Sequence, residues 1–279
     1  MFCRRHVVVF ECLCSKSIEY GINLWMASID LRKAFDRVEY SVLFRALCSQ
    51  NLPSEYLSLL AQMYSNQSGH LQGARRFLIN RGVKQGDIIS PLRFNSALEL
   101  AMKSWMAKIG QAGIELDGGR RLTNIRYADD IMVYATSLGE LTMMLEMLTV
   151  ELRIIGLELN QKKTKILTTV PMQQATVVEV AGEFVDILYG QAVHKYLGRK
   201  LPGQLSQRGR VELSHRVQNA WWKFNEHRDT LLDQGISVAS RLKIIRGSGH
   251  ADSFVWSLLL PPDEATGAEH RCVTATHVA

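Results

Sequence analysis

The sequence predicts an α+β fold in which helices pack on one face of an antiparallel sheet. Three observations support this prediction. An apolar run over 25–29 ends at Asp30 and is typical of a buried strand. Two further apolar runs flank Asp129-Asp130 and predict a hairpin with both acids at its tip. The segments between these strands carry apolar residues at helical spacing.

Each helix is predicted from its apolar spacing and from the residues at its ends. A helix over 7–20 ends at Gly21, because glycine suits the left-handed residue that closes many helices. A helix over 90–109 begins at Ser90, a suitable N-cap, followed by Pro91. The other early elements are two helices over 40–66 with a break at 51–54, and a short strand over 77–79.

The segment after the hairpin begins with the pattern Ser137-x-x-Glu140, which predicts a capping box. Its apolar residues recur every three or four positions, so we expect one buried helical face that ends at Gly156. That face consists of Leu141, Met144, Leu145, Leu148, Leu152 and Ile155.

Composition and charge favour a globular protein with a polyanionic partner. With 279 residues and 47% hydrophobic content, the chain can bury a sizeable core. The net charge is +6, and residues 191–250 hold eleven Lys or Arg against four acids. This stretch is either a solvated helical face or a surface that follows phosphates. Similarly, Tyr196 and the pair Trp221-Trp222 are suited to base stacking or to the core, and the core is favoured for the pair.

The cysteines and the apolar segments indicate the compartment. Five cysteines without paired spacing argue against a disulfide framework, so we expect a reduced, intracellular protein. The apolar run over 7–10 is too short for a membrane span, and Glu11 interrupts it. Neither a transmembrane helix nor a signal peptide is expected.

The acids at the strand ends suggest metal chemistry. An acid at the end of a buried strand is costly unless it meets a cation. Carboxylates brought together by two strands would form a set of oxygen ligands for Mg²⁺, which takes one or two carboxylates plus substrate phosphates. The alternative for Asp129-Asp130 alone is a surface turn.

Five segments, in order, resemble the motifs of the reverse transcriptase domain of non-LTR retrotransposons. They are Asp-x-x-Lys-Ala-Phe-Asp at 30–36, Arg-Gly-Val-Lys-Gln-Gly-Asp at 81–87, Tyr-Ala-Asp-Asp at 127–130, Gly-Leu-Glu-Leu-Asn-Gln-Lys-Lys-Thr at 156–164 and Lys-Tyr-Leu-Gly at 195–198. The resemblance extends from about residue 10 to about Arg246. It implies a polymerase palm over 1–200 with residual fingers at its start, a partial helical thumb over 201–246, and an irregular tail over 247–279.

The resemblance implies roles for individual residues. Asp30 and Asp129 would bind two Mg²⁺ ions, or Mn²⁺ in their place, and Asp130 would be a less direct ligand. Lys163 would protonate the leaving pyrophosphate, although a solvated lysine in a basic run is an equal alternative.

The same resemblance implies how the nucleotide is selected. Phe35 would exclude a ribose 2′-hydroxyl and so favour deoxynucleotides, although a phenylalanine on an amphipathic segment is more often part of a core. Gln85 and Gly86 would lie under the incoming nucleotide, where a glycine allows close approach of the main chain. The implied partners are an RNA template, a DNA primer and deoxynucleoside triphosphates, with no membrane.

The sequence also departs from the family. Little chain precedes Asp30, so the fingers are expected to be largely missing or supplied by another chain. Two functions therefore stand: RNA-directed DNA synthesis by two-metal nucleotidyl transfer, or a catalytically silent palm remnant that binds nucleic acid. A product of a eukaryotic retroelement would be expected in the nucleus. RNA-templated RNA synthesis is weaker, because such enzymes usually have glycine at the position of Ala128.

Overall fold

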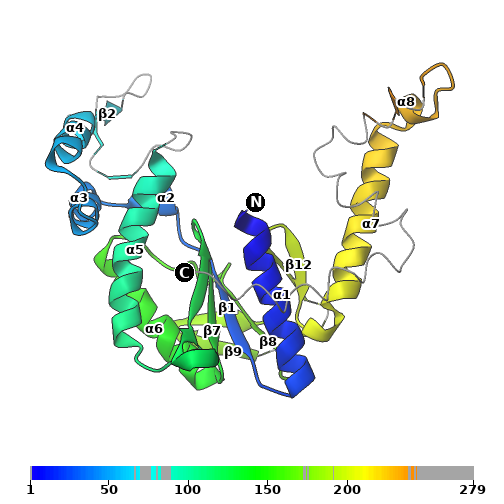
Figure 1. Ribbon diagram of the computed structural model, residues 1–279, viewed down its shortest axis with the longest axis horizontal. Coiled ribbons are helices and arrows are strands. Elements are labelled where there is room, and N and C mark those ends of the chain that lie inside the picture. Colours follow the sequence, from blue (N-terminus) through cyan, green and yellow to red (C-terminus); the bar gives the residue numbers. More distant parts are fainter. Residues whose placement is uncertain are drawn as a thin grey trace. The chain divides into compact units, whose positions relative to one another are not determined.

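A computed structural model describes residues 2–65, 67–69, 77–79, 81–82, 89–171, 174, 176–190, 192–237, 240–241 and 243. The chain forms two compact units, residues 1–208 and residues 209–279, and each is described by itself. Figure 1 labels their helices and strands.

The first unit contains a central sheet, several helices and three small hairpins (Figure 1). Its helices within the described residues are α1 (Phe2–Tyr20), α2 (Ala34–Arg37), α3 (Tyr40–Ser49), α4 (Ser54–Tyr64), α5 (Ser90–Lys108) and α6 (Leu138–Ile154). The central strands are β1 (Trp25–Ile29), β6 (Asn124–Tyr127), β7 (Asp130–Ala135), β8 (Lys165–Thr168), β9 (Thr176–Val180) and β10 (Glu183–Ile187). The small hairpins pair β2 (Ser68–Gly69) with β3 (Phe77–Leu78), β4 (Ile114–Glu115) with β5 (Arg121–Leu122), and β11 (Val193–Tyr196) with β12 (Arg199–Pro202).

The central sheet has the strand order β6-β7-β1-β8-β10-β9. Neighbouring strands are antiparallel except β8 and β10, which run parallel. Every residue of β1 is buried, as expected for a strand with neighbours on both sides and a layer on each face. The expected α+β class is therefore confirmed, with one parallel pair in an otherwise antiparallel sheet.

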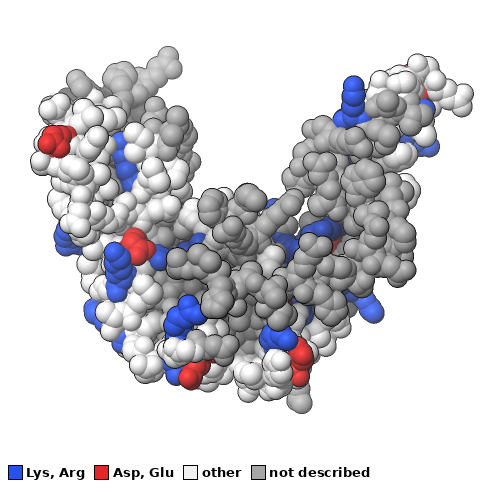
Figure 2. Space-filling model, in the orientation of Figure 1, with Lys and Arg blue, Asp and Glu red and all other residues white. Residues whose placement is uncertain are grey.

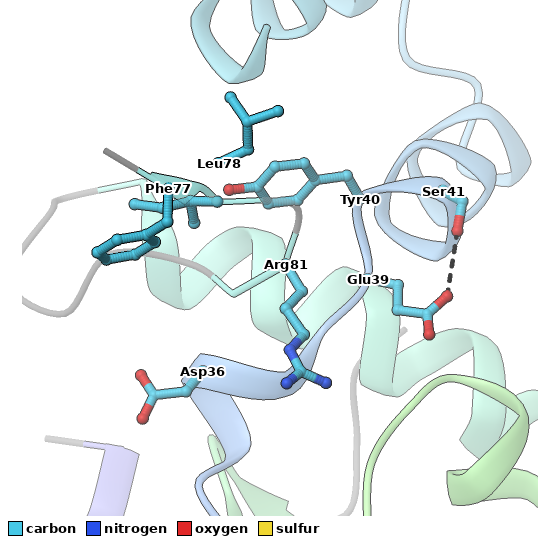
Figure 3. Close-up of a pocket in the computed structure, with 8 residues that line it drawn as sticks. Asp36, Glu39, Tyr40, Ser41, Phe77, Leu78 and Arg81 are labelled. Carbon is cyan, nitrogen blue, oxygen red and sulfur yellow. Dashed lines mark hydrogen bonds between the residues drawn. The ribbon is translucent and has the colours of Figure 1, made fainter. Parts of the chain in front are cut away.

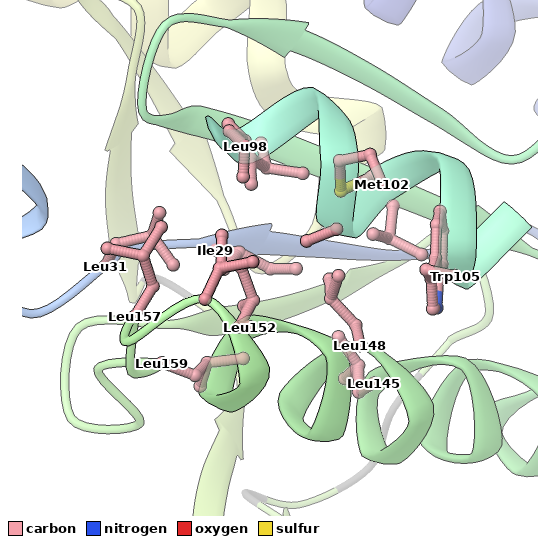
Figure 4. Packing of buried hydrophobic residues seen from close by; sticks show 14 of the residues in the cluster. Ile29, Leu31, Leu98, Met102, Trp105, Leu145, Leu148, Leu152, Leu157 and Leu159 are labelled. Atoms are coloured by element: carbon pink, nitrogen blue, oxygen red, sulfur yellow. The ribbon is translucent and has the colours of Figure 1, made fainter. Parts of the chain in front are cut away.

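Helices α5 and α6 cover one face of the sheet, where the larger core lies (Figures 1 and 4). Trp105 of α5 is fully buried, and its indole Nε1 donates to the Met144 carbonyl of α6 at 2.9 Å. Ile29 of β1 and Leu148 of α6 belong to the same cluster. The apolar face expected after the hairpin is buried at all six positions.

The other face of the sheet is also covered. Phe10 and Cys14 of α1 pack with Met26 of β1, Tyr134 of β7 and Leu201 of β12. The sequence prediction placed helices on one face only, and α1 with the β11–β12 hairpin forms a second layer. Burial raises the pKa of the Cys14 thiol to about 12, so this cysteine serves as an apolar core residue.

The ends of two helices test the predicted caps. Helix α5 begins at Ser90 itself with Ile89 as N-cap, so the expected capping role of the Ser90 hydroxyl is wrong, while proline does lie in the first turn. At α6 the prediction holds, because Ser137 is the N-cap and its side chain accepts from the Glu140 amide. The Glu140 carboxylate in turn accepts from Thr136 N at 2.7 Å and from Gly113 N at 3.0 Å.

Glu140 should make the stability of the first unit depend on pH. Burial alone would raise its pKa, but hydrogen bonds from Thr136, Gly113 and Ser137 together lower it. A lowered pKa means that the carboxylate stabilises the fold above its unfolded pKa, and that this stabilisation is lost as pH falls through the folded pKa. We expect Glu140→Gln to cost about 1 kcal/mol at pH 7. The cost should shrink as pH falls through the lowered folded pKa, where the parent carboxylate becomes protonated. Urea unfolding of both proteins over a pH series from 7 into acid measures the difference, and a cost that does not change with pH would contradict this role.

The second unit contains α7 (Arg208–Glu226), which begins at the last residue of the first unit, and α8 (Arg228–Leu232). Trp221 and Trp222 of α7 are 62% and 63% exposed, so the favoured placement in a core is wrong for this pair, whereas Tyr196 is buried. Lys223 lies 4.8 Å from the centroid of the Trp222 ring.

The basic stretch after residue 191 is partly neutralised by ion pairs. Arg199 and Arg208 both pair with Glu11 of α1, and within α7 Lys223 pairs with Glu226. On the face drawn in Figure 2, the Lys and Arg side chains of the described residues are scattered. Among the helices formed by the described residues, none is both long and apolar enough to cross a bilayer.

Candidate functional site

Adjacent strands bring Asp30 and Asp130 to the same end of the sheet. Asp30 follows the last residue of β1, and Asp130 is the first residue of β7. The two strands pair antiparallel with Ile29 opposite Ile131, so the next residues in register are Asp30 and Asp130. Two segments a hundred residues apart thus meet at one place, as expected from the sequence.

Asp129 lies in the turn that joins β6 to β7. Tyr127 pairs with Asp130, which leaves Ala128 and Asp129 as the two central residues of a tight hairpin. Ala128 has φ of 54°, in the left-handed region that glycine favours. A strained, short turn of this kind holds the exposed Asp129 beside the end of the sheet.

The acids affect one another electrostatically. Burial raises the pKa of Asp130, and the negative charges of Asp129 and Asp30 raise it further. A cation placed among these groups would reverse the last two effects. Within the described residues, however, no three His, Cys, Asp or Glu side chains gather tightly enough to hold an ion. The acids are therefore neighbours but do not form a preformed three-ligand cage.

The turn before β8 surrounds Asp30 with polar groups. The Asn160 side-chain amide donates to Oδ2 of Asp30 at 2.9 Å, and Nζ of Lys163 lies 3.9 Å from the same oxygen. The backbone amide of Asp30 donates to Oγ1 of Thr164 at 3.3 Å. Lys163 is placed near the acids as the resemblance implied, whereas the contacts of Asn160 and Thr164 were not foreseen.

The two residues after Asp30 are bonded to this turn at several points. Leu31 forms a β-bridge with Leu159, and the Arg32 amide donates to the Glu158 carbonyl at 2.8 Å. The Arg32 guanidinium also donates to Oε1 of Gln161 at 3.2 Å. The first and fourth of the five motifs therefore form one structural unit.

The three residues expected at the nucleotide have different outcomes. Phe35 is half-buried, and its ring stacks on that of Phe94 with centroids 4.8 Å apart. This contact suits a packing role and leaves part of the ring accessible. Gln85 and Gly86 lie outside the described residues.

A cavity of about 670 Å³ lies between the start of α3 and β3 (Figure 3). Arg81 extends between Asp36 and Glu39 there, and Glu39 and Arg81 form a backbone bridge. Gly82 N donates to the Val38 carbonyl at 2.8 Å. The main chain thus joins the segment just after the first motif to the start of the second. The cavity is lined by Asp36, Glu39, Tyr40, Ser41, Phe77, Leu78, Ile79 and Arg81.

The β11–β12 hairpin contacts the strand that carries Asp30. Nε2 of His194 is hydrogen-bonded to Oγ of Ser28 at 2.8 Å, two residues before Asp30. Burial lowers the pKa of His194, the positive charge of Lys165 lowers it further, and Asp30 acts in the opposite direction. The residue that precedes the fifth motif therefore packs against β1 close to Asp30, with a lowered pKa that favours the neutral imidazole.

Comparison with known proteins gives one family. Residues 12–201 match the family model described as reverse transcriptase (RNA-dependent DNA polymerase). The chain is 26% identical over 190 residues to a retrovirus-related Pol polyprotein from the type-2 retrotransposable element R2DM of Drosophila melanogaster, a match that covers 66% of this chain and 18% of that protein. It is 29% identical over 162 residues to a Pol polyprotein from the type-1 element R2 of Nasonia vitripennis, which covers 57% of this chain and 15% of that protein.

Among solved structures, telomerase from Candida tropicalis in complex with a fragment of telomeric RNA matches 90% of this chain and 40% of its own. The identity is 13% and the TM-score is 0.49. Telomerase from Candida albicans matches with 14% identity and a TM-score of 0.45, over 95% of this chain and 43% of that one.

Proposed function

Because this chain belongs to the reverse transcriptase (RNA-dependent DNA polymerase) family, of the kind found in non-LTR retrotransposons, we propose that it catalyses RNA-directed DNA synthesis. The observation that carries the proposal is the register of β1 and β7, which sets Asp30 beside Asp130 with Asp129 in the adjoining turn. The chain spans less than a fifth of each of these two relatives, so the activity of the whole proteins is proposed here for this segment alone.

The carboxylate oxygens of the three acids are suitable ligands for divalent metal ions. Asp30 and Asp129 would hold them, with Asp130 as the supporting acid, and substrate phosphates would complete the ligands. The raised pKa of Asp130, caused partly by its acidic neighbours, supports this fit because a cation relieves such repulsion. When bound, two Mg²⁺ ions, or Mn²⁺ in their place, would activate the primer 3′-hydroxyl and stabilise the charge that develops on the triphosphate.

Lys163 is the proposed proton donor to pyrophosphate. Its side chain is 70% exposed, and its only ion pair among the described residues is the 3.9 Å contact with Asp30. A long, exposed side chain can leave this contact and reach a leaving group beside the same acid. General acid catalysis of this kind contributes about 10²–10⁴-fold to rate.

The partners follow from the same proposal. An RNA template and a DNA primer would be held by the palm over 1–200 and by a partial thumb that includes α7 in 201–246. The exposed Trp221 and Trp222 support a nucleic-acid contact there, because exposed rings can stack on bases. As the product of a eukaryotic retroelement, the protein would be located in the nucleus.

Phe35 is the proposed sugar gate, and its substitution should change substrate choice. We expect Phe35→Ala to raise the incorporation of ribonucleotides relative to deoxynucleotides about 10-fold or more, because truncation opens space at the 2′ position. The ratio of kcat/KM for the two nucleotides measures this effect. Phe94→Leu provides a matched control, since it disturbs the same stacked pair from the buried side. An unchanged ratio in Phe35→Ala would mean that Phe35 only packs.

The test of the function is deoxynucleotide incorporation on an RNA template that carries a DNA primer, with Mg²⁺ and with chelator. Metal-dependent extension is expected. Salt-sensitive binding to the primed template without extension would contradict the proposal and identify a silent palm that still holds nucleic acid.

A further inference from the structure

We infer that Asn160 is a positioning residue that fixes the Asp30 carboxylate for metal binding. The inference rests on the proposed function and adds a residue that none of the expected roles included. Asn160 contacts Asp30 twice, although 130 residues separate them. Its side-chain amide donates to Oδ2 of Asp30 at 2.9 Å, and its backbone amide donates to the Asp30 carbonyl at 2.8 Å.

The two contacts restrict different movements of Asp30. The backbone bond fixes where the main chain of Asp30 lies after β1 ends. The side-chain bond fixes the rotation of the carboxylate, which is 39% exposed and would otherwise turn in solvent. A neutral amide is suited to this task, because it occupies one lone pair of Oδ2 without bringing a charge that competes with a cation. This hydrogen bond leaves Oδ1 and the second lone pair of Oδ2 to other groups, and Nζ of Lys163 is the cation that lies 3.9 Å from Oδ2.

The turn that carries Asn160 is itself held by hydrogen bonds. The Asn160 carbonyl accepts from the amides of Lys163 at 3.1 Å and of Thr164 at 2.8 Å. Thr164 is fully buried, and its hydroxyl accepts from the Asp30 amide. Asn160 therefore couples Asp30 to the turn that presents Lys163. Groups that orient a metal ligand in this way typically change metal affinity by about 10–100-fold when they are removed.

Gln161 is a matched control for Asn160. It lies in the same turn, is more buried at 6% exposure, and accepts from Arg32 rather than contacting Asp30. A general loosening of the turn would appear in Gln161→Ala as well as in Asn160→Ala. A specific effect on Asp30 would appear only in the second variant.

The experiment is a titration of the full chain with Mn²⁺, without nucleic acid, in which electron paramagnetic resonance counts the free ion. The variants are Asn160→Ala, Asn160→Leu, which keeps the side-chain volume, and Gln161→Ala, with thermal unfolding of each as a check of folding. We expect a loss of Mn²⁺ affinity of about 10–100-fold in both Asn160 variants and less than about 3-fold in the control. The KM for primed template should stay unchanged in all of them.

Two results would overturn the inference in distinguishable ways. Parent-like affinity in a folded Asn160→Leu would show that Asn160 does not position the metal ligand, while the proposed function would stand. An equal loss in Gln161→Ala would have the same meaning. Failure of the parent itself to bind Mn²⁺ would overturn the inference, whereas failure of the parent to extend a primer would overturn the proposed function, and the inference with it.

Discussion

Asp129→Asn should abolish primer extension, with a loss on the order of 10³-fold, because an amide binds a divalent cation far less well than a carboxylate of the same shape. Asp129 is exposed in the turn between β6 and β7, so stability should stay within about 0.5 kcal/mol of the parent. Initial rates on an RNA template with a DNA primer measure the loss, and urea unfolding measures the stability.

Asp130→Asn is the control for this prediction. As the supporting acid it should cost less activity than Asp129→Asn. Folding raises the pKa of the Asp130 carboxyl. At any pH above the unfolded pKa, keeping this carboxylate ionised therefore destabilises the folded state relative to the unfolded chain. The metal-free Asp130→Asn variant should therefore be slightly more stable than the parent at pH 7, with the difference vanishing in acid. Full activity in Asp129→Asn would contradict the assignment of the metal ligands.

Trp105→Ala should produce the largest loss of stability, about 3–5 kcal/mol. The side chain is fully buried between the sheet and α6, so truncation leaves a large cavity and removes the hydrogen bond to Met144. Trp105→Phe keeps most of the ring and loses only that bond and some volume, so it should cost about 1–2 kcal/mol. Denaturant unfolding gives both values. A cost under about 1.5 kcal/mol for the alanine variant would show that the α5–α6 layer is less important than its burial indicates.

Local patterns explain what could be predicted from the sequence. The hairpin around Asp129 was recognisable because two apolar runs flank a pair of turn-forming acids. The buried face of α6 followed from helical spacing together with the Ser137-x-x-Glu140 box. Such features depend on residues within one or two turns of each other.

Features that depend on distant contacts could not be predicted. β1 is buried on both faces, so its composition does not say which elements cover each face, and the layer formed by α1 was missed. Nothing local distinguishes Ser90 as the first helical residue from Ser90 as a cap. The exposed pair Trp221-Trp222 shows the same limit, since aromatic residues are usually buried.

The contact between Asn160 and Asp30 is the clearest case. Asn160 belongs to a motif that the resemblance identified, but no local rule says which group its amide meets 130 residues away. The fold supplies that information by pairing β1 with β8, which follows the turn directly. The candidate site therefore includes the turn before β8 as well as the acids, because the turn that orients Asp30 also carries Lys163.

Asp30 and Asp129 are proposed to bind the same metal centre, and cleavage of the chain by Fe²⁺ in place of Mg²⁺ tests this proposal most directly. Hydroxyl radicals formed at bound iron cut the nearest main chain, and mass spectrometry locates the cuts. Cuts within a few residues of both Asp30 and Asp129, suppressed by excess Mg²⁺ and absent in Asp129→Asn, are the predicted result. Cuts beside only one of these acids, or at sites unrelated to either, would contradict the account.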